Sequence, residues 1–156
     1  MKPNDLVAHA ERLAAASKRK PHQADLRRAV SAAYYALFHA VAGTAADTLI
    51  GTTKDHRTSP TWARVYRSLE HGFARNQCSA TSAVSQVPAG LTDVADAFVQ
   101  LQELRHEADY DPNASFLRQD VDAHIRQAKT AIGDLDAAPV RDRRIFAAWL
   151  VFKSKA

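Results

Sequence analysis

The chain has 156 residues, of which 46% are hydrophobic and 24% charged, and this composition is typical of a folded protein and excludes a disordered tail. Its length predicts a single domain over residues 1–156, and a formal net charge of +4 slightly favours anionic partners such as nucleic acid or nucleotides. Cys78 is the single cysteine, which excludes an internal disulfide and a cysteine cluster for zinc, and predicts a reducing, cytoplasmic compartment.

The residue pattern predicts an all-α protein, because Ala is abundant, Gly and Pro are few, and no run alternates as a strand would. We expect helices near residues 4–18, 22–50, 61–75, 91–110, 115–136 and 140–153. Residues 51–60 are expected to be a break, and residues 76–90 a mobile loop. No stretch is expected to be long and apolar enough to cross a membrane.

The predicted helix 22–50 has two different faces when its residues are rotated by about 100° each. The line that predicts the core contains Leu26, Val30, Ala33, Leu37 and Val41. A second group, nearly opposite, contains Arg28, Ser31, Tyr35 and His39. An aromatic ring between Arg and His is unusual for a solvated face. Two interpretations stay open: a half-buried contact between helices, or a surface that binds a ligand.

The predicted helix 91–110 carries a charge on its apolar face. The same rotation aligns Val94, Phe98, Leu101 and Arg105. Because a guanidinium is costly to bury without a partner, we predict that Asp109, four residues on, pairs with Arg105. The spacing fits a structural Arg–Asp pair, and it also fits a pair whose remaining donors hold a phosphate. We expect Arg105 to be a structural residue first.

The predicted C-terminal helix 140–153 combines three arginines with the apolar run 145–152. That run is too short to cross a bilayer, and it is hydrophobic on nearly all sides. Such a helix is typical of a contact with its own bundle or with a second subunit, and less typical of one that lies on a membrane surface.

Two motifs carry a resemblance to a known family. The string RRAVSAAYYALFHA at 27–40 is followed by LRHEADYDP at 104–112. Together they resemble the HEPN family of small helical nucleotide- or RNA-associated domains, in its prokaryotic branch with an R-A-x-x-x-A-Y-Y-A-x-F-H helix and a downstream R-x-x-A-D-Y. The resemblance covers the layout from about 22 to 136. It implies an up-and-down bundle of four to six helices that pairs as a homodimer.

The resemblance also implies a function. It suggests a nucleic-acid- or nucleotide-associated module of a toxin–antitoxin or defence type, and as an enzyme a metal-independent endoribonuclease. Arg105 matches the family Arg that holds the scissile phosphate, and the expected binding surface adds Arg28, Tyr35 and Asp109. His39 or Tyr110 would take the proton-transfer role.

Tyr110 is a departure from the family pattern. Active members have a His four to six residues after the Arg, and Tyr110 stands at that place. A tyrosine hydroxyl is a poor general base at neutral pH, although it can still hydrogen-bond a phosphate. The alternative is therefore a non-catalytic module, the dimerising partner subunit of a minimal nucleotidyltransferase.

Other sites have little support in the sequence. Arg64 with His71 and Arg118 with His124 also satisfy the Arg–His spacing, but about two such matches are expected by chance. The seven histidines include no pair three or four residues apart, so we expect no metal site, and no motif indicates a cofactor.

Overall fold

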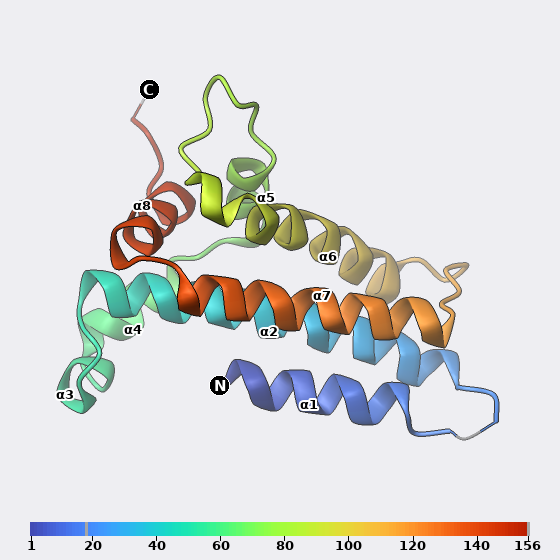
Figure 1. Cartoon of the computed structure of the whole chain (residues 1–156). Helices are drawn as coiled ribbons and strands as arrows, with labels where there is room; N and C mark the ends of the chain where they lie inside the picture. Colours follow the sequence, from blue (N-terminus) through green and yellow to red (C-terminus); the bar gives the residue numbers. More distant parts are fainter. Residues whose placement is uncertain (18, 156) are drawn as a thin grey trace.

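The protein is mainly helical in the part that the computed structural model describes, residues 1–17 and 19–155. Helices make up 73% of these residues and no strand occurs among them, which confirms the predicted all-α class (Figure 1). The elements are α1 (Pro3–Ala14), α2 (Gln23–Leu49), α3 (Lys54–Arg57), α4 (Pro60–Arg67), α5 (His71–Cys78), the 3-10 turn η1 (Ala89–Leu91), α6 (Thr92–Tyr110), α7 (Arg118–Ala137) and α8 (Val140–Val151). This part thus holds eight α-helices, more than the four to six expected.

Helix α2 lies at the centre of the fold. Helices α1, α4, α6, α7 and α8 all pack on it (Figure 1). Its predicted core line is confirmed, because the buried side chains include Leu26, Val30, Ala33, Leu37 and Val41. Many other buried positions of α2 are alanines, and small side chains let several neighbouring helices approach the same helix closely.

The expected single helix at 61–75 is wrong, because two helices occupy this region. Helix α4 ends at Arg67 and α5 begins at His71. The expected break at 51–60 is also partly helical, since it contains α3. The side chains of Thr53 and Ser59 each accept a hydrogen bond from a backbone N–H in the first turn of the helix that follows, so each of these short helices has its own cap.

The boundaries of two other segments differ from the prediction. Helix α1 ends at Ala14, and residue 18, the predicted end of that helix, lies outside the described residues. The segment 76–90 is not all loop, because α5 extends to Cys78 and η1 begins at Ala89. These differences do not change which helices surround α2.

Helix α2 is also long and apolar enough to cross a membrane by length and composition, contrary to the expectation that no stretch would be. In the protein, 67% of its most apolar 18-residue window is buried against other helices. Burial of this extent is typical of a core helix, whose apolar faces all contact protein.

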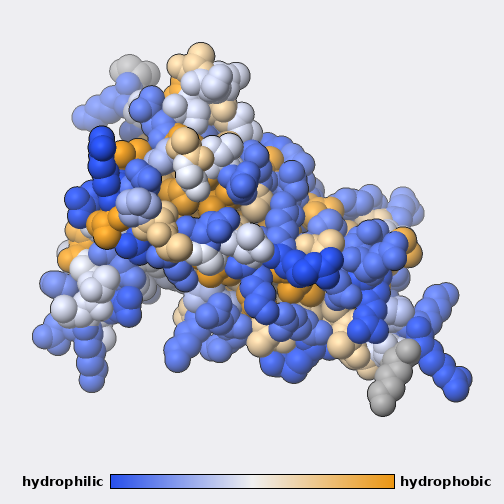
Figure 2. Space-filling model, in the orientation of Figure 1, coloured by the Kyte–Doolittle hydropathy of each residue, from blue (hydrophilic) through white to orange (hydrophobic). Residues whose placement is uncertain are grey.

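Helix α8 packs against the bundle of its own chain. Phe146, Ala147, Leu150 and Val151 are buried, and the helix contacts α2 and α5. This agrees with the prediction of a protein contact for the apolar run. In the face that Figure 2 shows, hydrophilic residues dominate, and hydrophobic ones gather over the end of the molecule that carries α5 and α8.

Gly51, in the turn between α2 and α3, has a backbone conformation that other residues rarely adopt. Its φ is 138°, and a Cβ at this position would lie 2.2 Å from Nδ1 of His56. We expect Gly51→Ala to destabilise the protein by about 1–3 kcal/mol, measured by thermal denaturation. Gly72→Ala, in α5 with open space around it, is the matched control and should melt at or slightly above the temperature of the parent protein. Equal melting temperatures for both variants would contradict this prediction.

Candidate functional site

Arg105 is the one buried charged side chain among residues 1–17 and 19–155, with 9% of its surface exposed. It continues the apolar line of α6, in which Val94, Phe98 and Leu101 are fully buried. This burial confirms the position that helical periodicity predicted for Arg105. The guanidinium therefore lies where a charge is costly unless other groups compensate for it.

Three tyrosine rings surround the guanidinium. Its central carbon, Cζ, lies 5.5 Å from the ring centre of Tyr34, 5.6 Å from that of Tyr35 and 6.0 Å from that of Tyr110. All three distances are within the range of cation–π attraction, which stabilises a buried cation without using its hydrogen-bond donors. The rings come from two adjacent positions of α2 and from the last residue of α6.

Asp109 is the predicted partner of Arg105, and the structure places it there. Its Oδ2 lies 3.6 Å from Nη1 of Arg105, which is an ion pair but is too long for a hydrogen bond. The other carboxylate oxygen, Oδ1, accepts a hydrogen bond from the hydroxyl of Ser31 on α2. About a third of the Asp109 side chain is exposed, at 34%. The carboxylate is thus held between two helices and at the edge of the solvent.

The donors of Arg105 are not all used within the protein. Its Nε is buried and has no hydrogen-bond partner among the described residues. A buried donor without a partner costs about 1–3 kcal/mol, and more when it belongs to a charged group. Such a group in a folded protein calls for an explanation, and a bound anion or water is one of the common ones. An oxygen of an anion such as phosphate would supply the partner that this donor lacks.

His71 joins this group, although its spacing from Arg64 is no more than chance predicts. Its Nδ1 shares a hydrogen bond of 2.6 Å with the hydroxyl of Tyr34, and its ring stacks on Phe38 with centres 4.1 Å apart. Burial and the nearby charge of Arg105 lower the pKa of His71, so the ring is neutral at pH 7. His71 begins α5, which packs on α6, and this packing brings its ring against Tyr34 and Phe38 of α2.

The lowered pKa of His71 predicts that acid destabilises the protein. Because its pKa in the folded state lies below that of an unfolded His, the unfolded chain binds more protons between the two values. This contribution to the free energy of unfolding is complete above about pH 6.5 and is lost as the pH falls through the folded-state pKa. The melting temperature should therefore fall when the pH is lowered from about 7.5 to about 5.5.

His71→Gln is the variant that checks this assignment, because it removes the titrating group. We expect a weaker pH dependence of the melting temperature, although not none, because burial also lowers the pKa of His39 and of His124. A melting temperature that rises as the pH falls through this window would show that the sign is wrong.

Arg27 fixes the end of α6, and the sequence analysis missed it. Its Nη1 donates to the carbonyl of Ala108 at 3.0 Å and to that of Asp111 at 2.7 Å. Its Nη2 donates to the carbonyls of Pro112 and Ala114. The last carbonyls of a helix have no hydrogen-bond donors within the helix. This guanidinium donates to the end of α6 and to the loop that follows it. It thereby positions the segment that ends in Asp109 and Tyr110.

The other predicted site residues are only partly brought together. Tyr35, Asp109 and Tyr110 lie around Arg105, as described above. Arg28 is exposed on α2 and no contact with this group is recorded for it. His39 hydrogen-bonds the hydroxyl of Tyr66 through Nδ1, and its ring stacks on that of Tyr66.

No group of three or more His, Cys, Asp or Glu side chains that could hold a metal ion occurs within the described ranges. Comparisons with protein-family models, with curated proteins and with solved structures find no match for this chain. Inferences about its function therefore rest on the residues and their geometry.

Proposed function

We propose that the protein is a HEPN-like helical module that binds single-stranded RNA, with Arg105 as the residue that holds a backbone phosphate. The observation that carries this proposal is the guanidinium of Arg105, which is buried, has an unpartnered Nε and has a single ion pair of 3.6 Å. A planar guanidinium with free donors matches the oxygens of a phosphate group.

The surroundings of Arg105 also support RNA. Tyr110 is 66% exposed at the edge of the site, and a base next to the bound phosphate can stack on such a ring. The net charge of +4 favours a polyanion. The two motifs that resemble the HEPN family supply Tyr35, Arg105, Asp109 and Tyr110, so the resemblance and the geometry point to the same group of residues.

The first test is RNA binding by variants that keep the fold. We expect Arg105→Met to weaken binding of a labelled single-stranded RNA at least about tenfold in fluorescence anisotropy, which corresponds to one charged contact with a phosphate. Arg126→Met removes an exposed arginine of α7 and is the matched control, with an expected loss below about twofold. Equal losses in the two variants would contradict the assignment of Arg105.

The second prediction is binding without cleavage. Tyr110 stands where the family has a catalytic His. His71, which contacts Tyr34 beside Arg105, already shares its Nδ1 with the Tyr34 hydroxyl and packs on Phe38. We expect intact RNA after long incubation with the purified protein in the presence of EDTA. Cleavage that is lost in Arg105→Met and kept in Arg126→Met would overturn this prediction.

A homodimer is the assembly that we propose, and its contact would be the end of the molecule that carries α8. Val140, the first residue of α8, and Phe152, which follows its last residue, are exposed large hydrophobic residues. A helix pair related by twofold symmetry would cover both. Light scattering at micromolar concentration should give twice the 17.1 kDa of one chain. A mass of one chain, or a dimer that persists in Phe152→Ser with full affinity, would exclude this contact.

The second candidate function is a non-catalytic partner subunit of a minimal nucleotidyltransferase, and the observation that favours it is again Tyr110. In that case the surface around Arg105 would contact protein. Co-expression with a small nucleotidyltransferase from a neighbouring gene would give a stable complex, and Arg105→Met would weaken that complex and leave RNA binding unaffected.

A further inference from the structure

A second group of side chains lies towards the C-terminal end of α2, away from Arg105. Two hollows of about 480 Å³ and 380 Å³ adjoin there. Both have Thr44, Asp47, Arg57 and Asp136 in their walls, so they are two compartments of one depression. Each is within the range of about 300–1,000 Å³ that is usual for sites of small molecules.

The larger compartment has an aromatic wall. The rings of Trp62 and Tyr66 stack with centres 5.1 Å apart and planes inclined by 24°. The rings of Tyr66 and His39 stack in turn, 5.8 Å apart and inclined by 20°. The hydrogen bond between the hydroxyl of Tyr66 and His39 fixes this part of the wall. Rings presented in this way favour a flat, aromatic ligand.

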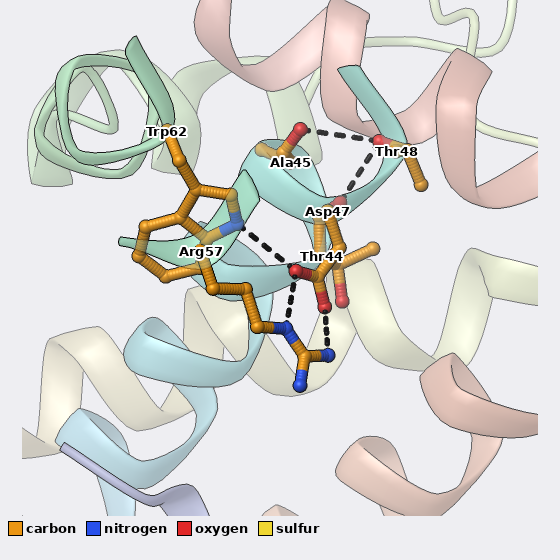
Figure 3. Close-up of polar contacts among 6 residues, drawn as sticks. All are labelled: Thr44, Ala45, Asp47, Thr48, Arg57 and Trp62. Carbon is orange, nitrogen blue, oxygen red and sulfur yellow. Dashed lines mark hydrogen bonds and ion pairs between the residues drawn. The ribbon is translucent and has the colours of Figure 1, made fainter. Parts of the chain in front are cut away.

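The wall shared by the two compartments is held by hydrogen bonds (Figure 3). Asp47 accepts from Nε of Arg57 at 3.0 Å, from Nη2 of Arg57 at 2.8 Å and from Nε1 of Trp62 at 3.0 Å. The carboxylate of Asp47 is thus neutralised by Arg57, so it does not repel an anion in the neighbouring compartment. Nη1 of Arg57 makes no hydrogen bond with the described residues, and Figure 3 shows it turned away from Asp47.

The smaller compartment is basic. Arg143 and Arg144 of α8 line it, together with Arg57, whose charge is balanced by that of Asp47. Nε of Arg143 is buried and has no hydrogen-bond partner among residues 1–17 and 19–155, the second such atom after Nε of Arg105. Asp136, a second carboxylate besides Asp47 in both linings, is exposed at the junction of the two compartments, and Asp5 lines the larger one. Guanidinium groups that line a hollow favour a phosphate, and a carboxylate beside it can accept from sugar hydroxyls.

We propose that the two compartments form one site for a nucleoside monophosphate. The base stacks in the compartment walled by Trp62 and Tyr66, the phosphate contacts Arg143 and Arg144, and the ribose hydroxyls donate to Asp136. This site is separate from Arg105, and it takes a free nucleotide and not a strand of RNA. It goes beyond the proposed RNA binding and does not depend on it.

Isothermal titration calorimetry with AMP, adenosine and inorganic phosphate tests this inference on the whole chain. We expect AMP to bind at a ratio of one to one, and adenosine and phosphate each to bind at least about tenfold more weakly, because each lacks one half of the contacts. Absence of measurable heat with millimolar AMP, or equal affinities for AMP and adenosine, would overturn the proposal.

Two variants of α8 locate the phosphate. Arg144→Gln should weaken AMP at least about fivefold and leave adenosine unchanged, because this side chain lines the basic compartment. Arg141→Gln is the matched control, since Arg141 is exposed on the same helix and lines neither compartment. Both positions are at the surface, so neither change should unfold the protein. Equal losses in the two variants would mean that AMP responds only to the net charge of the protein, which would overturn the proposal.

Arg105→Met separates this inference from the proposed function. AMP binding should be unchanged in that variant even though RNA binding is weakened. If Arg105→Met instead abolishes AMP binding, the nucleotide binds at Arg105, which overturns the second site and leaves the RNA proposal standing. If RNA binding fails in every test while AMP still depends on Arg144, the proposed function fails and the second site holds.

Discussion

Arg105→Ala should lower the melting temperature by about 6–12 °C, the change expected for a loss of about 3 kcal/mol in a chain of this size. The truncation leaves a cavity between the rings of Tyr34, Tyr35 and Tyr110 and removes the ion pair of Asp109. Removing one partner of a buried pair costs about 3–5 kcal/mol. The lower end applies here, because Asp109 is partly exposed and keeps its bond to Ser31.

Arg105→Met is the control that separates packing from charge. Methionine fills a similar volume with flexible apolar atoms and has no buried donor to satisfy. We therefore expect it to recover the part of the melting temperature that the cavity costs in Arg105→Ala, as measured by circular dichroism on heating, and to keep the loss that is due to the unpaired Asp109. If Arg105→Met melts as early as Arg105→Ala, the charge itself holds α6 against α2, and Arg105 is a structural ion-pair residue.

Arg27→Ala should cause the second large loss, about 2 kcal/mol or roughly 4–8 °C in melting temperature. Its hydrogen bonds to carbonyls at 108, 111, 112 and 114 close the end of α6. Water can reach several of these carbonyls, so the loss is smaller than the sum of individual charged hydrogen bonds. Because Tyr110 and Asp109 lie on this last turn, RNA affinity should fall as well.

The adjacent residue provides the control for Arg27. Arg28 is exposed on α2 and makes no side-chain hydrogen bond with residues 1–17 and 19–155. Arg28→Ala should therefore change the free energy of unfolding by less than about 0.5 kcal/mol, with a correspondingly small change in melting temperature. A larger loss in Arg28→Ala than in Arg27→Ala would contradict the assignment of the helix end to Arg27. The comparison is strict because the two residues have the same side chain and adjacent positions.

The features that helical periodicity determines could be predicted from the sequence. The core line from Leu26 to Val41 and the burial of Arg105 both follow from residues that recur every three or four positions. Asp109 was found as a partner of Arg105 for the same reason, since residues four apart lie on one side of a helix.

Features that depend on contacts between distant segments could not be predicted. Arg27 donates to carbonyl groups more than 80 positions away. Every residue has a backbone carbonyl, so the sequence does not indicate which ones accept a hydrogen bond from a side chain. His71 meets Tyr34 only because α5 folds back beside α2, and its spacing from Arg64 is no more frequent than chance. The break between α4 and α5 contains neither Pro nor Gly, so no local signal marked it. Whether Arg105 binds RNA stays a prediction.

The central claim is that Arg105 holds a phosphate of bound RNA, and the most direct test is whether its Nε–H forms a hydrogen bond when RNA binds. Its Nε–H resonance can be followed in the protein labelled with nitrogen-15, and it is assigned by its absence from Arg105→Met. A hydrogen bond to a phosphate oxygen would give this buried donor the partner that it lacks within the chain. We predict that unlabelled single-stranded RNA shifts the resonance and slows its exchange with water. RNA that saturates the protein and leaves the resonance unmoved would contradict the claim.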